Sequence, residues 1–144
     1  MKEPSGEARA ILDLCDGSAL RAFEIVQAQL GVLMLRTQVM LSLSGIVITV
    51  TGFSGRAIAE TSLLARVSIV CGLVLVLAAA AVAVGGVLRL KWLTEELGPD
   101  PLAVLTKGIA LRDRKASFLS VALTLFVLGF SLYCLAVAQL LIAA

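Results

Sequence analysis

The chain contains few side chains that could carry out chemistry, and none of them forms a known catalytic pattern. It has 144 residues and no histidine, so there is no imidazole to serve as base, metal ligand or switch near neutral pH. Its three cysteines, Cys15, Cys71 and Cys134, are far apart and form no CxxC pair, which predicts neither a disulfide framework nor a zinc site. No nucleophile elbow, P-loop or dinucleotide fingerprint is present. We therefore expect a protein that is not an enzyme, with no catalytic residue, metal or cofactor.

Weakly polar residues instead recur at helical spacing in two otherwise apolar segments. Their steps of three and four residues place each set along one side of a helix. The first stripe consists of Gln38, Ser42, Gly45, Thr49, Gly52 and Arg56. The second stripe consists of Ser117, Ser120, Thr124, Val127, Ser131, Cys134 and Ala138. A membrane helix with such a stripe is expected to contact something other than lipid.

Two interpretations of the stripes remain open. Small residues allow helix backbones to approach closely, and hydroxyl groups can bond across the contact or back to their own helix, so the stripes are first predicted to be packing surfaces. Alternatively, several such faces could line a polar pathway in an assembly, with Arg36, Gln38 or Arg56 at its mouths. The apolar segments contain no carboxylate, and this argues against a pump or an ion-coupled transporter.

Three long uncharged runs predict three membrane-spanning helices. About 20 residues at about 1.5 Å per residue cross a hydrocarbon core of roughly 30 Å. The predicted spans are residues 37–55, 67–88 and 116–142. Hydrophobic residues make up 60% of the chain, compared with about 45–50% in soluble domains. The expected fold class is an all-α integral membrane protein with three transmembrane helices that extend into the cytoplasm.

The N-terminal segment, residues 1–35, is predicted to be an amphipathic helical region ahead of the membrane domain, residues 36–144. A short helix is expected over residues 7–15. Asp16, Gly17 and Ser18 should interrupt it, after which Ser18 caps a second helix that continues through the first span.

A cytoplasmic helical hairpin is predicted over residues 89–115. Gly98 and Pro99 should end its first helix; Asp100 should cap the next, with Pro101 as the first helical residue. That second helix is expected to end in the charged cluster at residues 112–115. Leucine and phenylalanine side chains should pack the two cytoplasmic extensions together, namely Leu20, Phe23, Leu93, Leu97, Leu102 and Leu105.

The distribution of basic residues predicts the orientation. Ten of the twelve lysines and arginines lie before the first span or between the second and third spans. By the positive-inside rule the N-terminus is in the cytoplasm and the C-terminus is outside. The start of the chain lacks the apolar run of a signal peptide, so we expect the first span to direct targeting. The net charge of +2 is too balanced to predict a nucleic-acid surface.

Four cations stand at the predicted membrane boundary: Arg36, Arg112, Arg114 and Lys115. Such residues usually set topology, and this interpretation is favoured here. They can also bind anionic lipid headgroups, where each cation is worth about 1 kcal/mol. The lipid bilayer is in either case the first expected partner.

Two segments resemble the transmembrane effector family of bacterial Pycsar antiphage defence, which responds to cyclic nucleotides. Residues 36–49, RTQVMLSLSGIVIT, resemble that family's first span, and residues 112–119, RDRKASFL, resemble the basic run before its last span. The resemblance implies an oligomer in the bacterial inner membrane that compromises this membrane when triggered. Effectors of this kind can carry a separate nucleotide-sensing domain, which the residues before the first span are too few to form. Sensing would then lie in a partner or in the cytoplasmic extensions.

These observations predict a non-enzymatic small membrane protein that forms a homo-oligomeric helical assembly, in its specific form a membrane-permeabilising or channel-like effector. The alternative is a structural or accessory subunit that docks a larger membrane complex through its small-residue faces. The expected partners are therefore a second copy of the chain or a membrane or cytoplasmic protein.

Overall fold

A computed structural model describes residues 4–53, 63–88 and 100–143, with side chains described as far as Gln139. Its described part consists of four helices and contains no strand: α1 (Pro4–Leu14), α2 (Ala19–Phe53), α4 (Leu63–Gly86) and α5 (Pro101–Ala143). Three of them, α2, α4 and α5, are long and apolar enough to cross a membrane. The predicted fold class, an all-α membrane protein with three spanning helices, is confirmed.

The turn between α1 and α2 is where the sequence predicts it. The N–H of Gly17 donates to the carbonyl of Leu12 at 2.9 Å, and the N–H of Asp16 donates to the carbonyl of Asp13 at 3.2 Å. This pair of bonds is a Schellman motif, which requires a left-handed residue after the helix. Asp16 and Gly17 supply it, with φ angles of 53° and 75°. The next helix then begins at Ala19 and continues to Phe53 without a break.

Helix α5 begins as predicted but does not end where it was expected to. The N–H of Leu102 donates to Oδ1 of Asp100 at 3.0 Å, which confirms Asp100 as the cap. The expected end at residues 112–115 is wrong, because a single helix of 43 residues continues from Pro101 to Ala143. Neither glycine nor proline occurs between Ile109 and Leu128, and charged residues do not interrupt a helix.

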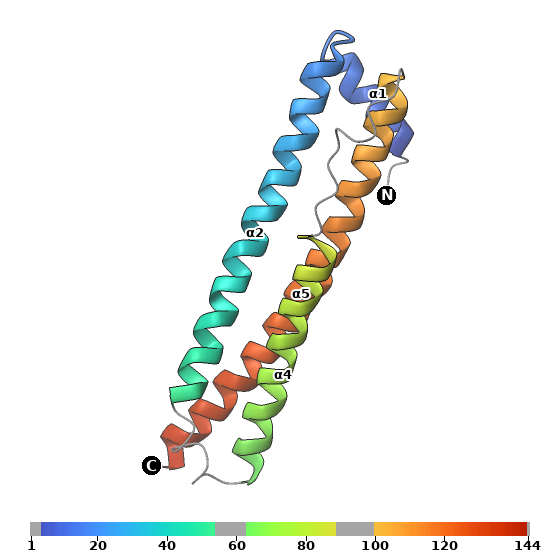
Figure 1. The fold of residues 1–144 in the computed structure, drawn as a ribbon. Helices are drawn as coiled ribbons and strands as arrows, with labels where there is room; N and C mark the ends of the chain where they lie inside the picture. Colours follow the sequence, from blue (N-terminus) through green and yellow to red (C-terminus); the bar gives the residue numbers. More distant parts are fainter. Residues whose placement is uncertain (1–3, 54–62, 89–99, 144) are drawn as a thin grey trace.

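The helices form an elongated bundle in which α2 and α5 run in the same direction (Figure 1). Helix α4 runs in the opposite direction and packs mainly against α5. The backbones of helices α4 and α5 approach each other closely at Gly72 and Gly129. A Cβ atom built on Gly72 would lie 2.8 Å from the carbonyl oxygen of Gly129, and one built on Gly129 would lie 2.7 Å from the carbonyl oxygen of Gly72. The two backbones can meet here only because neither residue has a side chain.

Each spanning helix buries one narrow seam with steps of three and four residues. On α4 the small residues Ala79 and Ala83 lie on the seam and are fully buried, whereas Ala81 and Gly85, at the same spacing, are exposed. Helix α2 joins the α4–α5 pair through a cluster of Met40, Ala83 and Ala122. The seam of α4 is Ala65, Ile69, Gly72, Val76, Ala79 and Ala83; that of α2 is Thr37, Met40, Ser44, Val47 and Thr51.

At the other end of the bundle, α1 folds back against α2 and α5 and completes a second apolar core. The prediction that the extensions pack together is partly wrong. Leu105 is buried and Phe23 and Leu102 border the core, but Leu20 is 73% exposed. Leu93 and Leu97 lie outside the described residues. Helix α1 supplies part of the apolar surface that the leucines were expected to provide. The core consists of Ala8, Cys15, Ala22, Val26, Leu105 and Ile109.

The glycine crossing provides a test of the bundle. Gly72→Ala should lower the free energy of unfolding by about 1–3 kcal/mol, because the new methyl group must push α5 away. Gly85→Ala is the matched control on the same helix, since nothing lies within 4 Å of its built Cβ. Reversible unfolding in mixed detergent micelles, followed by circular dichroism, measures both. Equal stability of the two variants would contradict the crossing.

Candidate functional site

The most elaborate polar arrangement in the described part of the chain surrounds Arg112 on α5. Its Nη1 donates to Glu7 Oε1 at 2.6 Å and to Gln29 Oε1 at 2.8 Å, and its Nη2 donates to Glu7 Oε2 at 3.0 Å and to Asp113 Oδ1 at 2.6 Å. Its Nε donates to Asp113 Oδ1 at 2.9 Å. A guanidinium has five N–H donors, and all five are used here. Arg112 thereby connects α1, α2 and α5.

This arrangement fixes the charge of Arg112. The hydrogen bonds that Arg112 donates to Glu7 are the largest cause that raises the pKa of Arg112 above its ordinary value, while partial burial acts in the opposite direction. Two carboxylates face one guanidinium, so the cluster formed by Arg112, Glu7 and Asp113 carries a formal charge of −1. Arg112 therefore acts as a connector between helices and has no donor left for a further anion in this conformation.

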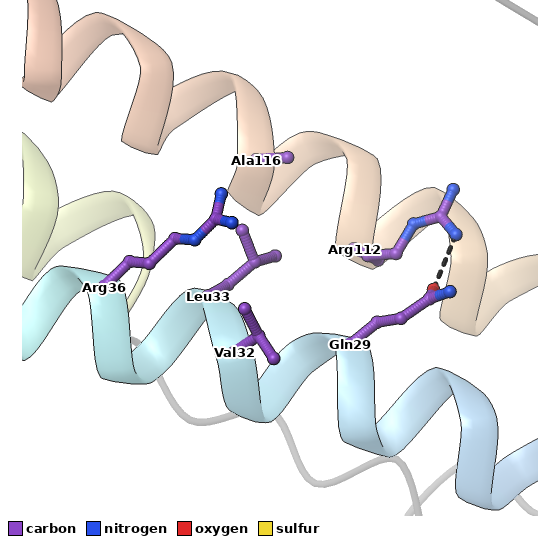
Figure 2. Close-up of a pocket in the computed structure, with 6 residues that line it drawn as sticks. All are labelled: Gln29, Val32, Leu33, Arg36, Arg112 and Ala116. Atoms are coloured by element: carbon purple, nitrogen blue, oxygen red, sulfur yellow. Dashed lines mark hydrogen bonds between the residues drawn. The ribbon is translucent and has the colours of Figure 1, made fainter.

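Arg36 on α2 lies in a different situation. It is exposed and makes no ion pair with any described residue. It lines an open pocket of about 330 Å³ between α2 and α5, together with Gln29, Val32, Leu33, Arg112 and Ala116. Figure 2 shows Arg36 and Arg112 at opposite ends of this pocket, with the apolar side chains between them. The structure thus brings two of the four predicted boundary cations into one pocket.

The other two boundary cations do not line this pocket. The guanidinium of Arg114 is exposed and lies over the ring of Phe118, with Cζ 5.9 Å from the ring centroid, a cation–π contact. Lys115 is only 6% exposed and occupies the buried seam of α5. Burial lowers the pKa of Lys115, because removal of water disfavours the charged ammonium.

Both predicted stripes lie on surfaces that the single chain leaves open. In the first stripe Gln38, Ser42, Gly45, Thr49 and Gly52 are all exposed, and Arg56 lies outside the described residues. The second stripe is exposed as well, at Ser117, Ser120, Thr124, Val127, Ser131, Cys134 and Ala138. These positions follow the buried seam of their helix by one or two residues, or about 100–200° around the axis. The stripes therefore do not pack against each other within the chain.

Several hydroxyl groups of the stripes bond along their own helix. Thr49 donates to the carbonyl of Gly45 at 2.8 Å, Thr124 to that of Ser120 at 3.0 Å, and Ser117 to that of Asp113 at 3.0 Å. A hydroxyl with such a partner can face lipid without an unpaired donor. These stripe positions are therefore compatible both with lipid and with another helix.

Two features of the site were not identified from the sequence. The first is the pairing of Glu7 and Gln29 with Arg112, which lies 105 and 83 residues away and leaves no local signal. The second is the buried seam of α2, whose members Thr37, Ser44 and Thr51 also donate to the carbonyl four residues earlier. That seam has the same three-and-four spacing as the first stripe. The spacing alone could therefore have identified a second small, polar face on α2.

The connector role of Arg112 can be tested with Arg112→Lys. Lysine keeps the charge but cannot bond two carboxylates and an amide with one planar group. We expect amide exchange in α1 to become about tenfold faster, since the lost bonds are worth about 1–2 kcal/mol at a partly exposed site. Hydrogen–deuterium exchange with mass spectrometry measures this. Arg114→Lys is the control; unchanged exchange in Arg112→Lys would contradict the connector.

Lys115 predicts a dependence of stability on pH. In the window between its lowered folded-state pKa and the ordinary value of 10.5, the unfolded chain binds more protons than the folded chain. Stability should therefore rise with pH through that window and gain nothing from Lys115 below it. Lys115→Met should be more stable at neutral pH and lack this rise. Detergent unfolding over a pH series checks both variants, and parallel curves would contradict the prediction.

The described residues contain no group of three cysteine, aspartate or glutamate side chains that could hold a metal ion. Cys15, Cys71 and Cys134 are all free thiols, the first buried and the others exposed. No protein-family model, curated protein or solved structure matches this chain. Function is therefore inferred from the boundary cations and the exposed stripes.

Proposed function

We propose that this chain is a non-enzymatic membrane module that associates with copies of itself through the two stripes. Neither stripe is used within the chain, although both have the composition of helix interfaces in membranes. The assembly is the functional form, and its proposed role is to permeabilise the membrane as a channel-like effector.

The observation that carries this proposal is that some glycines lie at a helix contact within the chain, whereas those of the first stripe do not. Gly72 and Gly129 are required for the crossing of α4 and α5. Gly45 and Gly52 on α2 have nothing within 4 Å of a built Cβ, so the fold of the single chain does not need them. Each costs a helix about 1 kcal/mol relative to alanine in water. A glycine on this exposed face would allow the backbone of a helix from another chain to approach closely.

The direction of the helices favours a ring. Helices α2 and α5 run the same way, and the Arg112–Gln29 bond sets their relative height (Figure 1). Residues whose numbers differ by about 83 therefore lie at similar depth, which places Gly52 of the first stripe near the depth of Cys134 in the second. A stripe on α2 that meets the α5 stripe of the next copy makes a head-to-tail contact, and repeated contacts of this kind form a ring when the rotation between copies closes.

The placement in the cell is part of the same proposal. The excess of basic residues before the first span and between the second and third supports an N-terminus in the cytoplasm and a C-terminus outside. The resemblance of residues 36–49 and 112–119 to Pycsar effectors supports the bacterial inner membrane and a role in breaching it.

Cysteine cross-linking in membranes tests the assembly. With Cys15 and Cys71 changed to serine, Gly52→Cys should form disulfides with Cys134 of a neighbouring copy and give a ladder of multimers after mild oxidation. Val50→Cys is the matched control, because it lies at nearly the same depth on another exposed face of α2. A ladder only for Gly52→Cys is the expected result, read on non-reducing gels.

The permeabilising role requires a second measurement. Vesicles that contain the cross-linkable assembly should release a trapped dye of small size, and Gly45→Ile should reduce both the ladder and the release. Ladders without release would contradict the permeabilising role alone. A monomer that neither cross-links nor releases dye would instead favour an accessory subunit that uses the same faces for a different protein.

A further inference from the structure

We propose that the pocket between α2 and α5 binds the phosphate headgroup of an anionic phospholipid, with Arg36 as the phosphate ligand. The pocket holds about 330 Å³ and is open to the outside. This proposal concerns the single chain and does not depend on self-association.

The depth of the pocket is the first argument. Arg36 directly precedes the uncharged run of residues 37–55, and Ala116 begins the uncharged run that continues to the C-terminus. Both residues line the pocket, so two spanning segments begin there side by side (Figure 2). This level is that of the lipid headgroups, and basic pockets between helices at this level are suited to anionic lipids.

The division of charge within the pocket is the second argument. The five donors of Arg112 are taken by Glu7, Asp113 and Gln29, and its cluster is formally negative. That end of the pocket therefore offers a phosphate anion no unused donor of Arg112. Arg36 has no ion pair with a described residue, and its guanidinium can donate two parallel bonds to phosphate oxygens. The anion accordingly belongs at the end of the pocket that Arg36 occupies.

The apolar walls distinguish a lipid from a soluble phosphate. Val32, Leu33 and Ala116 lie between the two arginines and offer hydrocarbon surface (Figure 2). A lipid can cover this surface with its glycerol backbone and the upper part of its acyl chains, whereas a free phosphate ester has nothing to place there. The shared chemistry is a phosphate anion, and the walls favour the form that carries acyl chains.

Native mass spectrometry of the full chain in detergent micelles tests the site. Wild-type protein should retain dioleoylphosphatidylglycerol in preference to dioleoylphosphatidylcholine. Arg36→Gln should weaken this preference about fivefold, the effect of one cation at a membrane surface. Arg21→Gln is the matched control, an exposed arginine on the same helix that does not line the pocket. An equal loss in both variants, or no loss in Arg36→Gln, would overturn the proposal.

A second pair of variants tests the pocket without a change in charge. Val32→Phe should fill the pocket and reduce lipid retention, whereas Val39→Phe, one heptad further along α2 and similarly exposed, should not. Circular dichroism confirms that both variants keep their helices. Retention by Val32→Phe equal to that by Val39→Phe would overturn the pocket.

A competition experiment with soluble glycerol phosphate completes the test. It should not displace the bound phosphatidylglycerol at millimolar concentration, and displacement would show that the ligand is a soluble phosphate ester rather than a lipid.

Discussion

The close crossing of α4 and α5 at Gly72 and Gly129 is the contact on which the rest of the bundle depends. Lipid is as apolar as the helices, so no hydrophobic force drives spanning helices together, and close packing must supply the attraction. The paired glycines allow it by exposing backbone to backbone. Helix α2 then rests on this pair through Met40, Ala83 and Ala122, where small side chains again keep the helices close. The positions of both stripes follow from how these three helices are rotated to bury their seams.

At the membrane boundary the charges divide into two kinds with different physical roles. Arg112 forms ion pairs with carboxylates from its own helix and from α1, and the pair with Glu7 holds α1 against the bundle. Arg36, on α2, makes no ion pair with a described residue and lies at the edge of an apolar pocket. Lys115 sits in the seam itself at a cost in desolvation. Boundary cations that look equivalent in the sequence therefore differ in the ligands they can accept.

The exposed stripes connect this architecture to the proposed function. A three-helix bundle with narrow seams leaves most of each helix facing outward, and in a membrane most outward surface needs only to be apolar. The outward stripes of α2 and α5 contain glycine, serine and threonine instead, and they lie on parallel helices. Such faces suit association with further helices, and their equal direction suits a repeated contact between copies.

By itself the sequence determined the helical membrane class, the three spans, the Asp16–Gly17 turn and the Asp100 cap, because each depends on local composition or on residues within one turn. It also located the four boundary cations. Only the tertiary structure decided which face of each helix is buried, since on α2 the seam Thr37 to Thr51 and the stripe Gln38 to Gly52 have the same spacing and similar small polar residues. It also decided that all donors of Arg112 are used while Arg36 makes no ion pair with a described residue, because two partners of Arg112, Glu7 and Gln29, lie 105 and 83 residues away. The periodicity of a sequence shows which residues share one side of a helix. Which side is buried depends on the neighbouring helices against which it packs.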